Sequence, residues 1–180
     1  MEPKPQDFGQ NILNQSTAQF LVDLAQPNHE MIIELGSWVG FSAWMLAKRY
    51  QKATVLCVDT WLGSVDLHEM PALRSLIESS YERFLHNTAP CAERIWPLRM
   101  DTVNGLCLAW ECGFHPSLIF IDAGHQYESA WGDIHAARRL FPEAHIVLDD
   151  YCHEGVGQAA RELLPNAIVS SDGVAAWFRP

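Results

Sequence analysis

Aspartate residues follow four short apolar segments of the sequence, at Asp59, Asp101, Asp122 and the pair Asp149–Asp150. Such apolar segments are typical of buried strands in a parallel sheet, and ligands bind these sheets at the carboxyl ends of the strands. We therefore expect these side chains to lie along one rim of a sheet. Asp101 has an alternative of equal weight, because an aspartate after a strand is also a common N-cap of the next helix.

Asp122, Asp149 and Asp150 are predicted to end two neighbouring strands, which would bring three carboxylates close together. Like charges in such a group raise one another's pKa values unless a cation neutralises them. Carboxylate oxygens suit Mg²⁺, Ca²⁺ or Mn²⁺ better than zinc. The group therefore predicts a site for a hard divalent cation. The alternative is one helix-capping aspartate and two solvated ones.

His125 follows Asp122 by three residues, after the flexible pair Ala123–Gly124. Beside a cation at the rim, an imidazole in this place could accept a proton from a hydroxyl held on the metal. His125 is therefore the predicted general base. His68 and His153 are weaker candidates in rim loops, and the other histidines are expected to be structural or exposed.

A strand, a glycine turn and a helix are predicted within Met31–Ser42. Met31–Leu35 is apolar and ends at Gly36, and after Gly40 the apolar residues recur at helical spacing. Gly36 permits a positive φ in the turn, and Gly40 permits close approach of helix and strand. The motif lacks the middle glycine with which dinucleotide enzymes approach a pyrophosphate. The expected ligand is a nucleoside without one, such as S-adenosylmethionine, with its carboxylate near Ser42 or the Gly40 amide.

Asp59 ends the second predicted strand, about twenty residues after Gly36, where an acid usually binds a ribose diol. A helix cap is less attractive here, because the next helix is predicted to begin only at Pro71. Trp38 and Trp61 lie in rim loops and are candidates to stack on an adenine or to line a pocket. Four other tryptophans are expected in the core: Trp44, Trp110, Trp131 and Trp177.

The alternation of strand and helix patterns predicts an α/β fold with five βα units and a mostly parallel seven-stranded sheet. The predicted strands cover residues 31–35, 53–58, 94–100, 117–121 and 145–148, and the predicted helices cover 8–25, 41–51, 71–86, 102–112, 127–140 and 154–164. Residues 167–170 and 174–178 form a predicted closing hairpin. We expect one domain over residues 1–180, in which residues 1–29 are a leading helical segment.

Composition restricts the classes of partner. The chain has 180 residues and a net charge of −10 without a run of Lys or Arg, which argues against nucleic acid as a ligand. Its five cysteines include no C-x-x-C pair, so neither a disulfide framework nor a thiolate zinc site is indicated. No segment approaches the ~18 apolar residues of a membrane span. The N-terminus lacks a signal-like apolar region, so no membrane association and a cytoplasmic location are expected.

The motif ELGSWVGFS at 34–42 resembles the first motif of class I S-adenosylmethionine-dependent methyltransferases. It is most similar to that of the metal-dependent O-methyltransferases, which include the catechol O-methyltransferase type. IDAGHQY at 121–127 with Asp133, and VLDDY at 147–151, resemble a bacterial branch of this family. That branch includes sugar O-methyltransferases of macrolide pathways and relatives of the cephalosporin-biosynthesis protein, and CVDTWLG at 57–63 fits it too.

This resemblance implies a Rossmann-like class I methyltransferase fold with helices on both faces of the sheet and a C-terminal antiparallel hairpin. It implies metal ligation by Asp122, Asp149 and Asp150, and Asp122 and His125 are the expected catalytic residues. The residues expected to bind the cofactor are Glu34, Gly36, Ser37, Gly40, Ser42, Asp59, Thr60, Trp61, Met100, Asp101 and Asp122. Ala123 departs from the branch, which usually has glycine there, and the substrate-capping insertions of relatives are missing.

The predicted function is methyl transfer from S-adenosylmethionine to a hydroxyl of a small molecule, assisted by Mg²⁺, Ca²⁺ or Mn²⁺. From the resemblance, a sugar or natural product is the first expected acceptor and a phenol or catechol the second. The alternatives are a non-catalytic module that binds S-adenosylmethionine or another nucleoside, and an enzyme that uses the same pocket for non-methyl chemistry.

An uncapped rim with Trp38, Trp61 and Leu62 predicts exposed apolar surface and hence a homodimer or larger homo-oligomer.

Overall fold

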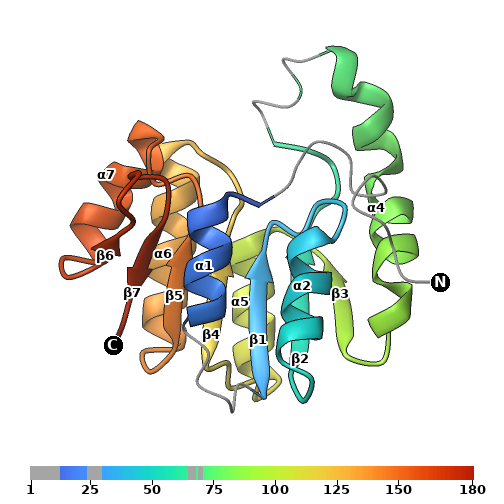
Figure 1. The fold of residues 1–180 in the computed structure, drawn as a ribbon, viewed down its shortest axis with the longest axis horizontal. Coiled ribbons are helices and arrows are strands. Elements are labelled where there is room, and N and C mark those ends of the chain that lie inside the picture. Colours follow the sequence, from blue (N-terminus) through green and yellow to red (C-terminus); the bar gives the residue numbers. More distant parts are fainter. Residues whose placement is uncertain (1–12, 24–29, 65–67, 69–70) are drawn as a thin grey trace.

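The computed structural model describes residues 13–23, 30–64, 68 and 71–180 (Figure 1). The helices are α1 Gln15–Asp23, α2 Phe41–Arg49, α4 Arg74–Thr88, α5 Thr102–Glu111, α6 Tyr127–Leu140 and α7 Glu154–Leu163. The strands are β1 Met31–Leu35, β2 Thr54–Asp59, β3 Ile95–Arg99, β4 Leu118–Ile121, β5 His145–Leu148, β6 Ile168–Val169 and β7 Ala176–Phe178. Two short 3₁₀ helices, Pro71–Leu73 and Ala89–Cys91, flank α4.

The strands form one seven-stranded sheet in the order β3-β2-β1-β4-β5-β7-β6. Strands β1 to β5 are parallel, whereas β7 runs antiparallel to both β5 and β6. The predicted fold class, a Rossmann-like methyltransferase fold with a closing antiparallel hairpin, is confirmed. The hairpin strands are shorter than predicted.

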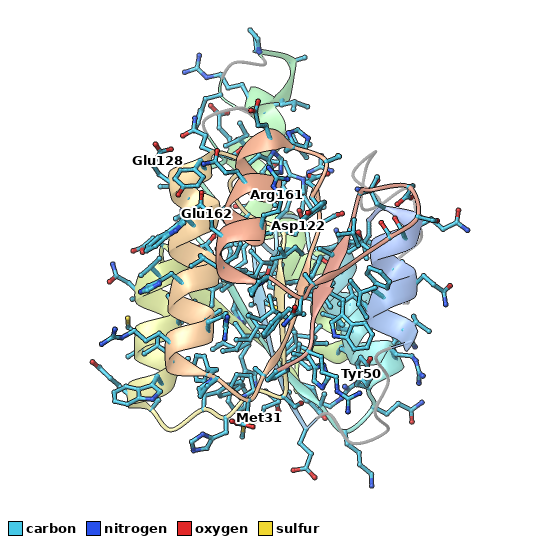
Figure 2. All side chains as sticks on the ribbon, turned by 90° about the vertical axis from the view of Figure 1, so that its left-hand side faces the viewer. Met31, Tyr50, Asp122, Glu128, Arg161 and Glu162 are labelled. Atoms are coloured by element: carbon cyan, nitrogen blue, oxygen red, sulfur yellow. The ribbon has the colours of Figure 1, made fainter. Side chains whose placement is uncertain are left out.

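The chain reverses direction across the sheet between β1 and β4. It runs from β1 outward through β2 to β3, and β4 then returns to the other side of β1. Ligands of open parallel sheets bind at this switch point, outside the carboxyl ends of the strands. In Figure 2, Met31 marks the amino ends of the strands and Asp122 marks the opposite rim.

Helices cover both faces of the sheet. On one face, Leu21 of α1, Leu46 of α2 and Phe84 of α4 are buried in one apolar cluster. On the other face, Ile134 of α6 and Ala160 of α7 belong to a second cluster, which also includes residues of α5. Because both faces are covered, the central strands are apolar on both sides, which is why they read as continuous apolar runs.

Several boundaries differ from the predictions. The leading helix begins at Gln15, and residues 13 and 14, which the prediction included, are not helical. Residues 8–12 and 24–29 lie outside the described residues. The helix predicted from Pro71 begins with a 3₁₀ turn and continues as α4 to Thr88. None of the helices in the described part of the chain has the length and apolar content needed to span a membrane.

Two tryptophan predictions are wrong. Trp110 is 55% exposed rather than buried, because α5 buries Leu106 and Ala109 and turns its next position outward. Trp61 is only 3% exposed and lies in the core, where it meets the rings of Tyr81 and Phe84 edge-on. The exposed apolar rim expected from Trp61 is therefore absent at this residue, although Leu62 is 59% exposed.

Candidate active site

A cavity of about 910 Å³ opens at the carboxyl ends of the parallel strands. It is lined by most of the predicted cofactor residues: Gly36, Ser37, Gly40, Ser42, Asp59, Thr60, Asp101 and Asp122. The predicted base and the other two predicted metal ligands line it as well: His125, Asp149 and Asp150. The structure does not place Glu34, Trp61 or Met100 on its wall.

Gly36 and Gly40 shape the turn between β1 and α2. Both have positive φ, 86° and 87°. A Cβ atom on Gly36 would lie 1.9 Å from the carbonyl oxygen of Asp122, so glycine is required for the turn to lie against the end of β4. A Cβ atom on Gly40 would lie 2.7 Å from Thr88 Cγ2. The close approach predicted at Gly40 is therefore with α4 and not with the strand.

The Asp59 carboxylate joins the loops that follow β1 and β2. Its Oδ2 accepts a hydrogen bond from the Trp38 amide at 2.8 Å, and its Oδ1 accepts one from the Trp61 amide at 2.7 Å. Trp61 Nε1 also donates to the Trp38 carbonyl at 2.7 Å. Burial raises the pKa of Asp59, and these amides partly offset that effect. Asp59, which was predicted to bind a ribose, thus also has a structural role that the sequence did not indicate.

Glu34 is fully buried behind the glycine turn. Neither of its carboxylate oxygens makes a hydrogen bond of good geometry. Burial raises the pKa of Glu34 to about 7, and the neighbouring Ser37, Ser42 and Cys57 only partly oppose this effect. Glu34 therefore lies beneath the predicted cofactor site, where a neutral carboxyl is favoured below pH 7.

Asp101 is the N-cap of α5, as the alternative interpretation proposed. Its Oδ1 accepts a hydrogen bond from the Asn104 amide at 3.0 Å, while it also lies on the cavity wall. Next to it, the Thr102 hydroxyl donates a short hydrogen bond to Asp133. Burial raises the pKa of Asp133 to about 6. Thr102 and Asp133 also line the cavity but were not predicted as site residues.

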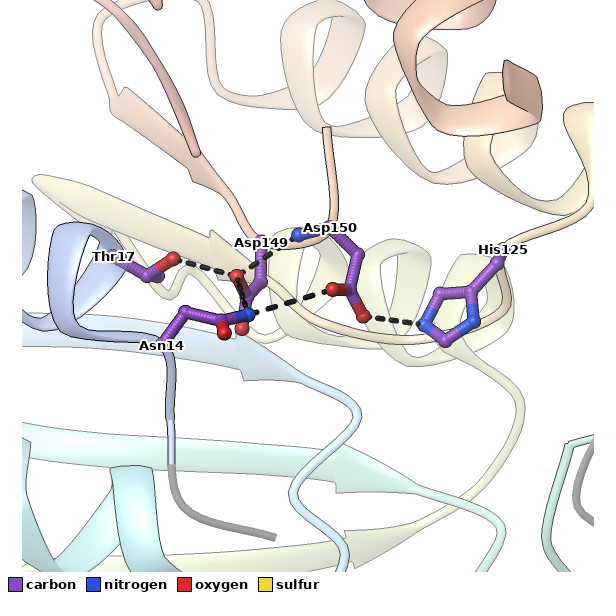
Figure 3. A network of polar contacts seen from close by, with 5 residues as sticks. All are labelled: Asn14, Thr17, His125, Asp149 and Asp150. Carbon is purple, nitrogen blue, oxygen red and sulfur yellow. Dashed lines mark hydrogen bonds and ion pairs between the residues drawn. The ribbon is translucent and has the colours of Figure 1, made fainter. Parts of the chain in front are cut away.

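The acidic cluster lies at the ends of β4 and β5, which pair as predicted. Burial, followed by the charges of Asp149 and Asp150, raises the pKa of Asp122 well above its usual range. Asp149 Oδ1 accepts hydrogen bonds from Thr17 Oγ1 at 2.5 Å, from the Asp150 amide at 2.9 Å and from Asn14 Nδ2 at 3.0 Å (Figure 3). One predicted metal ligand is thus held by the N-terminal segment.

His125 lies beside the acidic cluster, as predicted. Its Nε2 is 2.9 Å from Asp150 Oδ2, and both side chains are about one quarter exposed (Figure 3). The hydrogen bond from His125 lowers the pKa of Asp150 and outweighs the opposing effect of its partial burial. Asp150 has a φ of 53°, in the left-handed region that aspartate tolerates better than most residues. The ring of His153 lies 4.6 Å from that of His125, centroid to centroid.

Residues 33–151 match the family model described as a methyltransferase domain. The chain belongs to this methyltransferase family. A comparison with curated proteins finds no significant match.

Similar solved structures support this methyltransferase fold. The O-methyltransferase from Bacillus cereus in complex with SAH is 18% identical, with a TM-score of 0.63, and the alignment covers 99% of this chain and 92% of that one. The SAH-bound methyltransferase PaMTH1 of Podospora anserina is 14% identical, with a TM-score of 0.65 and coverage of 94% and 80%. CalS11, a TDP-rhamnose 3′-O-methyltransferase of calicheamicin biosynthesis, is 16% identical, with a TM-score of 0.60 and coverage of 91% and 77%.

The match to the methyltransferase family covers the glycine turn and the acidic cluster but not α1. Asn14 and Thr17 therefore lie outside the matched region, although both contact Asp149. No motif in the sequence identifies them, because polar residues at the start of a short helix, such as Asn14 before α1 and Thr17 in its first turn, have many possible partners. The contact between α1 and β5 in the folded chain is what brings them to the site.

Proposed function

We propose that this methyltransferase transfers the methyl group of S-adenosylmethionine to a hydroxyl of a small molecule, with assistance from a divalent cation. One observation carries the proposal: the glycine turn after β1 and the group of Asp122, His125 and Asp150 line the same cavity. A methyl donor at the turn would thus lie next to groups that can remove a proton from an acceptor. Solved structures with SAH or with O-methyltransferase activity in their names support the same choice of cofactor and reaction.

The cofactor would bind between the glycine turn and Asp59. The N-terminus of α2 lines the cavity, so the positive end of its helix dipole suits a carboxylate, and the motif has no glycine dedicated to a pyrophosphate. In the turn before it, the amides of Gly36, Trp38 and Gly40 already donate hydrogen bonds within the chain. Both oxygens of Asp59 already accept amide hydrogen bonds, yet each retains lone pairs that a ribose diol can use. The cavity is near the upper end of the ~300–1,000 Å³ of small-molecule sites, which favours room for two reactants.

The cation would be held by Asp122, Asp149 and Asp150. The raised pKa of Asp122, which follows from burial and from the two neighbouring carboxylates, is the sign of a cluster that a bound cation would stabilise. Carboxylate oxygens are the donors preferred by Mg²⁺, Ca²⁺ and Mn²⁺. When bound, such a cation would lower the pKa of an acceptor hydroxyl.

His125 is the proposed base. It would accept the hydroxyl proton, and the Asp150 carboxylate at 2.9 Å would stabilise the resulting imidazolium. The oxygen then forms a bond to the methyl carbon as the carbon–sulfur bond breaks, which leaves S-adenosylhomocysteine. The chain contributes mainly orientation, because the two reactants must meet in line.

We infer a sugar or natural-product hydroxyl as the first acceptor class and a phenol or catechol as the second. We also propose a homodimer or larger assembly, because Leu62 near the rim exposes apolar surface to solvent. Light scattering would test it, because a particle of 20.3 kDa at micromolar concentration contradicts an oligomer.

The proposed function is tested by a methyl-transfer screen against sugars, phenols and natural-product scaffolds, with Mg²⁺ or with excess chelator. We expect transfer with Mg²⁺, none in chelator, and S-adenosylmethionine binding in both. Asp59→Ala should weaken cofactor binding by about 1–3 kcal/mol, the cost of lost hydrogen bonds to a charged group. Full turnover in excess chelator would refute a role for the cation. Cofactor binding without any methyl transfer would favour the alternative of a non-catalytic nucleoside-binding module.

A further inference from the structure

The rim of the cavity holds a group of potential metal ligands that differs from the three predicted carboxylates. One ring nitrogen each of His125 and His153, and one carboxylate oxygen of Asp150, lie within 4.8 Å of one another. His125 and Asp150 are partly exposed and His153 is exposed, so a cation can reach them from solvent. The group therefore offers two nitrogen donors and one oxygen donor on an accessible surface.

The start of α7 is packed so that these side chains meet. A Cβ atom on Gly155 would lie 2.5 Å from the carbonyl oxygen of His125 and 2.6 Å from the amide nitrogen of Tyr127. Glycine at this position thus permits the α7 terminus to approach the loop that carries His125. The His153 amide also donates to the Asp150 carbonyl at 2.8 Å, which fixes the turn between these two residues. As a result, the two imidazole rings lie 4.6 Å apart at 33°.

Two imidazoles and one carboxylate are an unusual set for Mg²⁺, which prefers oxygen ligands and retains water. Imidazole suits Zn²⁺, Co²⁺ and related cations, and two histidines with one carboxylate are a common protein ligand set for them. Ligand bonds of 2.0–2.2 Å place neighbouring donor atoms roughly 3 Å apart. The 2.9 Å between His125 Nε2 and Asp150 Oδ2 already fits this spacing, and only the exposed His153 ring has to move inward.

We propose that His125, Asp150 and His153 form a site for a borderline divalent cation such as Zn²⁺ or Co²⁺. The site shares Asp150 with the carboxylate site proposed for Mg²⁺, so the two cannot be filled independently. The consequence for turnover rests on the proposed function: a cation bound to His125 through Nε2 leaves the ring proton on Nδ1, so the imidazole keeps no lone pair with which to accept a proton from an acceptor. Zn²⁺ is therefore expected to inhibit methyl transfer that Mg²⁺ supports.

The binding test uses the full chain, stripped of metal, without cofactor or acceptor. Co²⁺ is titrated while its visible absorption is recorded, Zn²⁺ affinity is obtained by displacement of Co²⁺, and Mg²⁺ affinity is obtained by calorimetry. We expect visible bands typical of a nitrogen-ligated site. His153→Ala should weaken Zn²⁺ and Co²⁺ binding at least tenfold and leave Mg²⁺ binding unchanged, since Mg²⁺ would not use this ligand.

Two further variants keep the result interpretable. The His153 side chain makes no capping hydrogen bond to α7, and asparagine is a favourable N-cap residue, so His153→Asn should show the same loss of Zn²⁺ binding without a loss of fold. His115→Ala removes an exposed histidine that precedes β4, at the opposite end of the sheet, and should bind Zn²⁺ like the unmodified protein.

Two results would overturn the site. One is Zn²⁺ binding that both His153 variants leave unchanged. The other is a near-ultraviolet thiolate band with Co²⁺ that disappears in Cys152→Ser, which would assign the cation to the exposed thiol beside His153. Because binding is measured without cofactor or acceptor, a failure to find methyl transfer counts against the proposed function alone.

Discussion

The carboxylates in the two halves of the cavity, at β1 and β2 and at β4 and β5, differ in the groups that hold them. On the side of β1 and β2, Glu34 within β1 is buried beneath the cavity without a good hydrogen-bond partner, and Asp59 at the end of β2 is held by backbone amides of the two loops that follow these strands. After β4 and β5, Asp149 and Asp150 are held mainly by side chains, and these come from Asn14 just before α1, from Thr17 of α1 and from the His125 loop. The first half is therefore held by backbone groups of two neighbouring loops, and the second by side chains that include residues of the N-terminal segment, up to 135 residues away in the sequence.

This contrast assigns different chemistry to the two halves. Backbone amides satisfy the Asp59 carboxylate, and the Glu34 carboxyl buried beneath it favours its neutral form below pH 7, so this half has little free charge, which suits recognition of a nucleoside. Carboxylates and imidazoles that face the cavity can exchange protons and bind cations. Substitutions in each half test whether the two halves are separable in this way.

Removal of the predicted base should act on the second half alone. His125→Ala is expected to lower turnover by roughly 10²–10⁴-fold, the usual contribution of a general base. Its affinity for S-adenosylmethionine should change little, because His125 faces the acceptor side. His135→Ala, an exposed position on α6, is the matched control and should retain normal turnover. Turnover of His125→Ala within a few-fold of the unmodified protein would show that the base is elsewhere or not needed.

Substitution of Gly36 should damage the junction between the halves. Gly36→Ala combines a positive φ with a Cβ atom 1.9 Å from the Asp122 carbonyl, so it should cost about 3 kcal/mol or more of unfolding free energy. Gly113→Ala is the matched control, since Gly113 has a φ of 75° but no atom within 4 Å of a new Cβ. Urea unfolding of both variants separates the steric clash from backbone strain. An equal loss of unfolding free energy in Gly36→Ala and Gly113→Ala would show that the predicted steric clash is absent.

The hydrogen bond from α1 should matter to the acidic half. Thr17→Val keeps the shape of the buried side chain but removes the hydroxyl that donates to Asp149, so unfolding should become easier by about 1.5–3 kcal/mol. Mg²⁺ affinity should also fall, because Asp149 loses an orienting contact. Thr88→Val is the control, as the Thr88 hydroxyl donates only to the Phe84 carbonyl of its own helix. An unchanged Mg²⁺ affinity in Thr17→Val would separate α1 from the proposed cation site.

Glu34 gives a pH-dependent test of the first half. Its pKa is about 7 in the folded chain against an ordinary 4.5. Between these two pH values Glu34 is therefore protonated more fully in the folded chain than in the unfolded chain. The stability that Glu34 contributes is therefore highest at low pH and is lost as pH rises toward 7. Glu34→Gln should remove this loss. Between pH 5.5 and pH 8 the free energy of unfolding of the variant should therefore rise by about 2 kcal/mol relative to that of the unmodified protein. Glu143→Gln, on the surface, should show no such gain in urea unfolding at the two pH values.

Local patterns predicted most of the fold. Helix α6 and strand β5 have the predicted ends, because apolar periodicity and flanking polar residues mark both. Errors arose where tertiary contacts override a local pattern. Trp61 looked like a rim residue because it follows Asp59, but its φ of 52° turns the ring into the core between Tyr81 and Phe84.

Residue types and their spacing within a few residues were enough to predict the glycine turn, the acidic strand ends and the place of His125. The folded chain was needed to show that Asn14 and Thr17 hold Asp149 and that His153 lies beside His125. Thr17 and Asp149 are 132 residues apart. Whether they meet depends on which face of the sheet α1 covers and how it is rotated there. Those choices are made by the packing of Leu21 and its apolar neighbours, which no short-range pattern records.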